Sequence, residues 1–314
     1  MKRTAKKNPV ARGAAGGRKA APRALDLSMA GRFDRAAEDV GNIVALEHVN
    51  LLVGDQRTAT LFYLVAMGFT RDPYLMPGVD LMWVNLGRSQ FHLPNGEPQI
   101  LRGRIGIVLP DRAALLARLE RVRPRLEGTR FDWREHPGHV DVTCPWGNTF
   151  RCHAPEAQYG PMMLGMPYVE FDVPAGTADG IARFYRDILG APATVTAGRT
   201  GRVANVAAGI GQSLRFRETK ASLPAYDGHH VQVYVADFSG PHRRLLERGL
   251  VTEESDQHQY RFVSLVDPVD GRALYEVEHE VRSMRHPLYA RPLALMQELG
   301  VHRTCGFWPP RFSV

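Results

Sequence analysis

Two short apolar segments with the same pattern, far apart in the chain, constrain the fold most. One segment is led by His48 and the other by His230, and an aspartate follows each histidine after seven residues, at Asp55 and Asp237. Beyond each aspartate the apolar residues change from strand-like alternation to helical spacing. Two histidines at equivalent positions of two similar strands can be brought together by a fold that pairs the repeats.

A strand–helix–three-strand unit occurs four times, at about 44–98, 101–155, 165–219 and 227–279. Helices are expected at 57–67, 113–122, 178–189 and 241–248. Asp55 is placed to cap the first helix, because its carboxylate can accept from the free N–H groups of the first turn. One such unit leaves its sheet edge and concave face uncovered. We therefore predict an α+β fold in which four βαβββ modules pair into two curved-sheet domains.

The repeats also predict how the chain divides. We expect a first domain at 43–157, with modules 1 and 2, and a second at 163–280, with modules 3 and 4. Residues 1–42 are rich in Ala, Gly, Lys and Arg without hydrophobic periodicity, so we interpret them as a disordered basic tail, with an organelle transit peptide as the alternative. The C-terminal tail, 281–314, either covers a cleft or is solvated, and we favour the solvated tail.

The composition argues against nucleic acid and membranes as partners. The formal net charge is +7, but much of the surplus lies in the basic N-terminal tail. No apolar run approaches the roughly 20 residues of a membrane helix. The three cysteines lack CxxC spacing, which indicates reduced thiols in a cytoplasmic protein. We expect a small-molecule substrate as the partner, and a homodimer is compatible with the sequence.

The modules resemble those of the vicinal-oxygen-chelate superfamily, which includes glyoxalase I, extradiol dioxygenases and bleomycin-resistance-type proteins. The resemblance covers about 44–279 and rests on Glu47-His48-Val49-Asn50, Phe62-Tyr63…Met67-Gly68-Phe69, Pro145-Trp146-Gly147-Asn148, and Asp267-Pro268-Val269-Asp270-Gly271 before Tyr275-Glu276. It implies that the two paired-module domains are glyoxalase-like. The chemistry of the superfamily is diverse, so the fold alone gives weak guidance to the reaction.

In this superfamily, metal ligands come from the first and last strands of a module. The matching positions are His48 and His92 in module 1, and His230 and Glu276 in module 4. His92 and Glu276 each lie five residues after the glycine of the preceding turn. Residues two positions away share a strand face, so Gln90 beside His92 and Glu278 beside Glu276 are alternatives.

Modules 2 and 3 depart from this pattern. They carry arginines or a tyrosine near the ligand positions, and none of these is a good ligand in its usual protonation state: Arg104, Arg151, Tyr168 and Arg215. We therefore expect modules 1 and 4 to pair, as in fused glyoxalase I chains. The pairing of modules 3 and 4 found in extradiol dioxygenases is the alternative. The three arginines are expected to form structural ion pairs rather than to bind an anion.

Three imidazoles and a carboxylate suit a borderline divalent ion such as Fe²⁺, Zn²⁺, Mn²⁺, Ni²⁺ or Co²⁺. Such an ion could stabilise an enediolate or a catecholate, with Glu276 as the catalytic base once released from the ion. We expect a metal-dependent enzyme acting on a small oxygen-rich substrate, either a lyase or isomerase or a ring-cleaving dioxygenase. The alternative is a non-catalytic binding or resistance protein whose apolar pocket is walled by Trp83, Phe91, Tyr234 and Tyr260.

Overall fold

The computed structural model describes residues 34–75, 78–198, 201–291, 293–294 and 304–305. Contacts divide the chain into Met1–Asp39 and Val40–Val314, and the second unit holds the sheets and the helices α1 to α4. The predicted disorder of the N-terminal tail falls mainly on 1–33, outside the described residues, and a short 3-10 helix occupies Ala36–Glu38. No helix in the described ranges is long and apolar enough to span a membrane.

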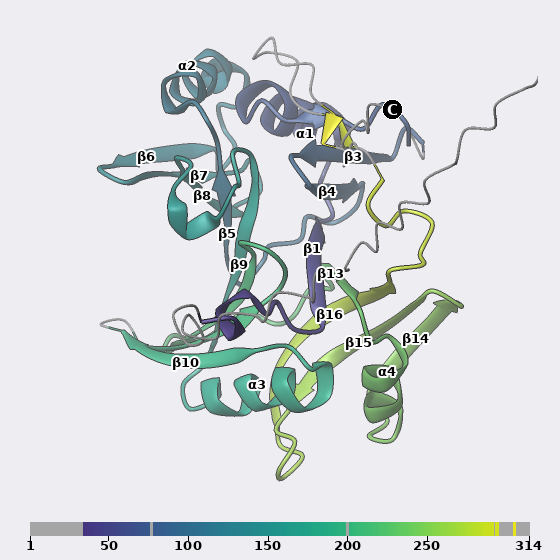
Figure 1. Cartoon of the computed structure of the whole chain (residues 1–314). Helices are drawn as coiled ribbons and strands as arrows, with labels where there is room; N and C mark the ends of the chain where they lie inside the picture. The colour runs from purple at the N-terminus through teal and green to yellow at the C-terminus, as the bar shows by residue number, and fades with distance from the viewer. Residues whose placement is uncertain (1–33, 76–77, 199–200, 292, 295–303, 306–314) are drawn as a thin grey trace, which may run out of the picture. The chain divides into compact units, whose positions relative to one another are not determined.

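One eight-stranded sheet in the described residues combines modules 1 and 4 (Figure 1). Its strands, in order, are β14 (Val251–Asp256), β15 (Gln259–Val266), β16 (Ala273–Ser283), β13 (His230–Val235), β1 (Ile43–Asn50), β4 (Ser89–Pro94), β3 (Leu81–Leu86) and β2 (Thr70–Arg71). β1 and β13 pair antiparallel at its centre, and each pairs in parallel with the last strand of its own module. The predicted pairing of modules 1 and 4 is confirmed, and the alternative pairing of modules 3 and 4 is wrong.

A second eight-stranded sheet combines modules 2 and 3 in the same manner. Its strands, in order, are β10 (Ala193–Gly198), β11 (Gly201–Ala207), β12 (Ser213–Thr219), β9 (Gly165–Pro174), β5 (Gly103–Val108), β8 (Thr149–His153), β7 (His139–Thr143) and β6 (Asp132–His136). β5 and β9 form the central antiparallel pair. The predicted α+β fold of four βαβββ modules paired into two sheets is confirmed.

An aspartate caps the helix in the first two modules, and for Asp55 this confirms the prediction from the sequence. The helices are α1 (Gln56–Ala59), which continues as a π-helical turn to Ala66, α2 (Arg112–Val122), α3 (Ala178–Phe184), which continues as a π-helical turn to Leu189, and α4 (Ser239–Leu246). Asp55 accepts a hydrogen bond from the N–H of Thr58, and Asp111 accepts one from the N–H of Ala114. Each carboxylate satisfies a free N–H group of the first turn.

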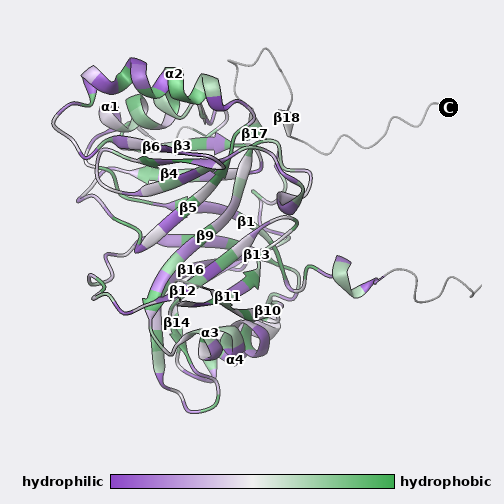
Figure 2. Ribbon diagram, turned by 90° about the vertical axis from the view of Figure 1, so that its left-hand side faces the viewer, coloured by the Kyte–Doolittle hydropathy of each residue, from purple (hydrophilic) through white to green (hydrophobic). Residues whose placement is uncertain are grey.

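The sheets join module 1 to module 4 and module 2 to module 3. The helices and the aromatic core instead join module 1 to module 2 and module 3 to module 4. α1 lies beside α2 at one end of the unit, and α3 lies beside α4 at the other (Figure 1, Figure 2). Phe62 and Tyr63 of module 1 pack on Phe150 of module 2, with ring centroids 5.5 and 6.0 Å apart.

The two sheets do not follow the predicted domains 43–157 and 163–280, and that division of the chain stays a prediction. The two helices within 43–157 lie side by side, and so do the two helices within 163–280. Neither half of the chain forms a complete sheet by itself. Each sheet takes one module from each half. The physical reason is that the free edge of β1 pairs with β13, which lies in the other half of the chain.

Candidate metal centre and adjoining pocket

Two histidines meet near the centre of the first sheet. β1 and β13 pair with Val49 opposite Val231, so His48 and His230 lie diagonally across that pair. Their ring centroids are 5.7 Å apart. The pair of valines marks a local two-fold axis between modules 1 and 4, which is why equal positions in the two repeats become neighbours in space.

The carboxylate that completes the cluster is Glu280. Ligand atoms of His48, His230 and Glu280 all lie within 4.8 Å of one another, and the three side chains are buried. Glu280 Oε2 is 3.4 Å from His230 Nε2. The strand register places Glu280 beside Gln232 and Gln232 beside His48, in one row across three strands. Side chains in one row of a sheet are close neighbours.

Glu276, which the sequence suggests as ligand and catalytic base, lies outside the cluster. It is exposed, four residues before Glu280 on β16, and its backbone carbonyl accepts a hydrogen bond from Arg102. Counting five residues from the turn glycine does not give equivalent positions in the two strands, because β16 has 11 residues and β4 has 6. The pairing of β16 with β15 also contains two irregularities. The carboxylate that lies beside the two histidines is therefore Glu280, and the roles predicted for Glu276 stay predictions.

His92 stacks on the cluster but is not one of its three converging side chains. Its ring centroid lies 3.7 Å from that of His48 and 4.0 Å from that of Trp83. Burial holds the pKa of both His48 and His92 well below the ordinary value, so both rings are neutral, which is the form that binds metals. Within the described residues, neither ring nitrogen of His48 has a hydrogen-bond partner. Leaving such buried groups unsatisfied is costly, and a bound cation would satisfy one of them.

Two arginines hold the carboxylate of this cluster. Arg282 lies 2.5 Å from Glu280 and 3.4 Å from Glu47, and Arg261 lies 2.6 Å from Glu280. Burial opposes ionisation of Glu280, but a hydrogen bond from His230 and the charges of the two arginines lower its pKa to about 2. The Glu280 carboxylate is therefore ionised, and its negative charge is shared between the two guanidinium groups.

Glu47 reaches the same face of the sheet through a β-bulge. The register of β1 shifts between Leu46 and His48, so the side chains of Glu47 and His48 share a face although they are consecutive. The Glu47 carboxylate lies 3.5 Å from His48 Nδ1 and 3.4 Å from the Tyr234 hydroxyl. Burial raises the pKa of Glu47 to about 7. Sequence alternation misses this residue because it assigns Glu47 to the opposite face.

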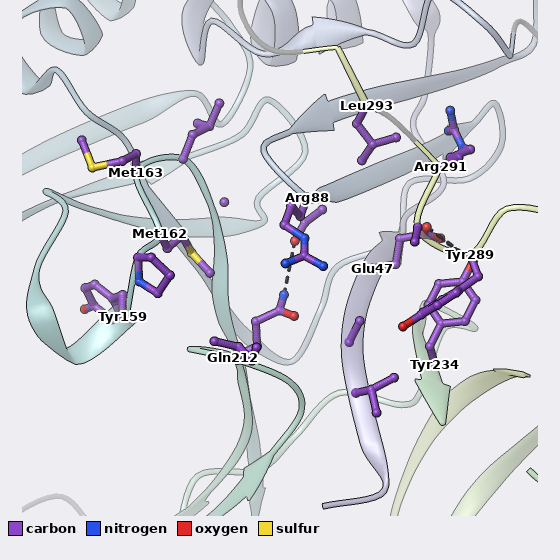
Figure 3. Close-up of a pocket in the computed structure, with 18 residues that line it drawn as sticks. Glu47, Arg88, Tyr159, Met162, Met163, Gln212, Tyr234, Tyr289, Arg291 and Leu293 are labelled. Atoms are coloured by element: carbon purple, nitrogen blue, oxygen red, sulfur yellow. Dashed lines mark hydrogen bonds between the residues drawn. The ribbon is translucent and has the colours of Figure 1, made fainter. Parts of the chain in front are cut away.

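A cavity of about 380 Å³ opens beside Glu47 (Figure 3). Tyr234 and Glu47 line it from the first sheet, and Met162 and Met163 line it from the connection between modules 2 and 3. Of the four aromatic residues that the sequence suggests as pocket walls, only Tyr234 lies among the lining residues. The cavity is therefore formed where the first sheet meets a connecting segment rather than within one module.

The C-terminal segment crosses the first sheet where the structure describes it. The Tyr289 ring lies 4.9 Å from that of Tyr234, and both line the cavity. Arg291 lies 2.5 Å from the buried carboxylate of Asp72 and 5.7 Å from the ring of Trp83. The expectation of a solvated tail is wrong for Tyr289 and Arg291, whereas 295–303 and 306–314 lie outside the described residues.

The corresponding face of the second sheet carries ion pairs. Arg104 and Arg151 each pair with a carboxylate, at 3.0 and 2.8 Å. Arg215 instead lies 3.8 Å above the ring of Tyr168. Structural ion pairs are thus confirmed for Arg104 and Arg151, and Arg215 is stacked.

Comparisons with known proteins agree with this architecture. No family model and no curated protein matches the sequence. Among solved structures, the chain is similar to a suspected dioxygenase from Bacillus subtilis, with 16% identity and a TM-score of 0.54 over 78% of this chain and 86% of that one. It is also similar to glyoxalase I from Zea mays, with 13% identity and a TM-score of 0.52 over 76% of this chain and 92% of that one. At these identities the likeness shows a shared fold and leaves the reaction and the metal open.

Proposed function

Because the chain has the fold of the vicinal-oxygen-chelate superfamily, in its form with four modules, we propose that it is a divalent-metal-dependent enzyme acting on a small oxygen-rich organic substrate. The observation that carries this proposal is the convergence of His48, His230 and Glu280 at buried positions of one sheet. Two imidazoles and one carboxylate are a ligand set typical of sites that keep positions open for substrate. His92, predicted as a further ligand, supports the ring of His48 by stacking on it.

The polar atoms at this place suit a borderline divalent ion such as Fe²⁺, Zn²⁺, Mn²⁺, Ni²⁺ or Co²⁺. Both nitrogens of His48 and both amide atoms of its neighbour Gln232 lack hydrogen-bond partners in the described residues. Buried polar groups normally find partners, so a gathering of unpartnered ones favours a ligand-binding role. A bound ion with open positions would act as a Lewis acid toward two adjacent oxygens of a substrate.

The charges around the cluster favour an anionic species once a cation is present. The arginines and acids that gather here nearly cancel: Arg261, Arg282, Arg291, Glu47, Asp72, Glu278 and Glu280. A divalent cation would leave the region net positive, which suits a substrate whose oxygens gain negative charge. Glu47 contacts His48 and lines the cavity, so its position makes it the candidate general base in place of Glu276.

A non-catalytic binding protein is the second candidate, and one observation favours it. Glu280 already pairs with Arg261 and Arg282, so the cluster is electrically balanced without an ion. The adjoining cavity is lined by methionine and tyrosine side chains, among them Met162 and Met163, which suits an apolar ligand.

Elemental analysis of the purified chain distinguishes the two candidates. The comparison is between the wild type and a His48→Ala, His230→Ala double variant. A His242→Ala, His258→Ala variant is the matched control, because these histidines lie outside the cluster. The enzyme proposal predicts one equivalent less of divalent metal in the double variant and no loss in the control. Equal metal in all three proteins would contradict the site, and a metal-free wild type that binds apolar ligands would favour the binding protein.

Reconstitution with single metals separates the reaction types. A ring-cleaving dioxygenase would require Fe²⁺ and consume O₂ with catechol-type substrates. A lyase or isomerase that works through an enediolate would be active with Zn²⁺ or Ni²⁺ and would not need O₂. Turnover that is independent of added metal in the chelator-treated chain would contradict both forms of the proposal.

A further inference from the structure

A second group of metal-ligating side chains lies at the outer hairpin of the second sheet. His136 ends β6 and His139 begins β7, and the two residues between them close the hairpin so that the histidines are directly opposed. Their rings stack with centroids 4.5 Å apart. Asp141 follows two residues after His139 on the same face of β7. The tight turn therefore gathers three potential ligands from six consecutive residues.

Both histidines direct Nε2 toward one carboxylate oxygen. Asp141 Oδ2 lies 3.6 Å from Nε2 of His136 and 3.6 Å from Nε2 of His139, and the three ligand atoms lie within 4.8 Å of one another. These separations are too long for hydrogen bonds. In a tetrahedral zinc site with bonds of about 2.1 Å, ligand atoms are about 3.4 Å apart. The two nitrogen–oxygen distances of 3.6 Å are therefore close to those of a coordination site.

We propose that His136, His139 and Asp141 bind a borderline divalent ion, such as Zn²⁺, Ni²⁺ or Cu²⁺, with water in the remaining positions. Imidazole and carboxylate are ligands that these ions accept. His139 Nε2 is buried and has no hydrogen-bond partner in the described residues. Neutral imidazole is the form of histidine that coordinates such ions.

Arg151 affects such a site in two ways. Its guanidinium holds both oxygens of Asp141, at 2.8 and 2.9 Å, and so fixes the orientation of the ligand. Its positive charge also repels a cation, so we expect micromolar rather than nanomolar affinity. Because β6 is at the edge of the sheet, an ion shared by β6 and β7 would resist opening of the hairpin.

Calorimetric titration of the full, chelator-treated chain with Zn²⁺ tests the proposal. The His48→Ala, His230→Ala background removes the candidate centre of the first sheet, so that remaining binding reports on the hairpin. We expect one equivalent of Zn²⁺ to bind in this background. Adding His136→Gln and His139→Gln should abolish it, and adding His242→Gln should not. No binding in the background, or unchanged binding after removal of both hairpin histidines, would overturn the proposal.

Amide hydrogen exchange of the wild type with and without Zn²⁺ gives a readout that does not depend on a variant folding. Bound Zn²⁺ should slow exchange at least several-fold over 132–143, while the distant edge of the same sheet, 193–198, stays unchanged. Equal exchange at 132–143 with and without Zn²⁺ would contradict the site.

Discussion

Replacing Glu280 by glutamine tests the assignment of the carboxylate ligand, because Glu276 on the same strand provides a matched control. Glutamine keeps the size of the side chain and removes its charge. Glu280 is 2% exposed, whereas Glu276 is exposed. We expect Glu280→Gln to lower both the free energy of unfolding and the metal content, and Glu276→Gln to change neither.

The ion pairs of Glu280 set the size of the effect on stability. Its carboxylate lies 2.6 Å from Arg261 and 2.5 Å from Arg282. Removing one partner of a buried ion pair costs about 3–5 kcal/mol. Each arginine keeps a second carboxylate, Glu278 for Arg261 and Glu47 for Arg282. The loss should therefore be at the lower end of that range, about 3 kcal/mol.

Two assays read out this comparison. Denaturant unfolding of the metal-free proteins measures the change in stability, and elemental analysis after metal loading measures occupancy. An exposed substitution such as Glu276→Gln should change the free energy of unfolding by no more than about 0.5 kcal/mol. Similar losses in both variants would refute the reasoning. So would a Glu280→Gln protein that keeps its stability and its metal.

Three further predictions concern the C-terminal segment, acid stability and the shared core. Arg291→Ala leaves the buried carboxylate of Asp72 without the partner at 2.5 Å. Hydrogen exchange over 284–291 should then rise several-fold, and unchanged exchange would contradict the contact. Burial lowers the pKa of His279 to about 4, so this ring stays neutral in the fold but gains a proton on unfolding below about pH 6.5. About 3 kcal/mol of stability should be lost as the pH falls from about 6.5 to 4, and a His279→Gln variant with the same pH dependence would exclude this cause. Phe150→Ala should cost about 3–5 kcal/mol in a single unfolding transition, because Phe150 joins modules 1 and 2; two separate transitions, one of them unchanged, would argue against a shared core.

The sequence by itself determined the modules and the meeting of His48 with His230. Strand and helix periods are local properties, and an aspartate at a helix start acts on the next few residues, so both can be predicted without knowledge of the rest of the chain. The two histidines hold equivalent positions in their repeats, and pairing two repeats about a local two-fold axis brings equivalent positions together. Their proximity follows from the repeat itself.

Only the tertiary structure decided which carboxylate joins them and what surrounds the site. Glu280, rather than Glu276, reaches the cluster. Which residue of β16 lies beside the histidines depends on the length of β16 and on its register with β13, and hydrogen bonds between the strands set that register. The face that Glu47 occupies depends on a bulge in β1. The contact between Arg291 and Asp72 joins residues 219 positions apart. Such features arise from long-range pairing and packing, which the local periodicity of a sequence does not encode.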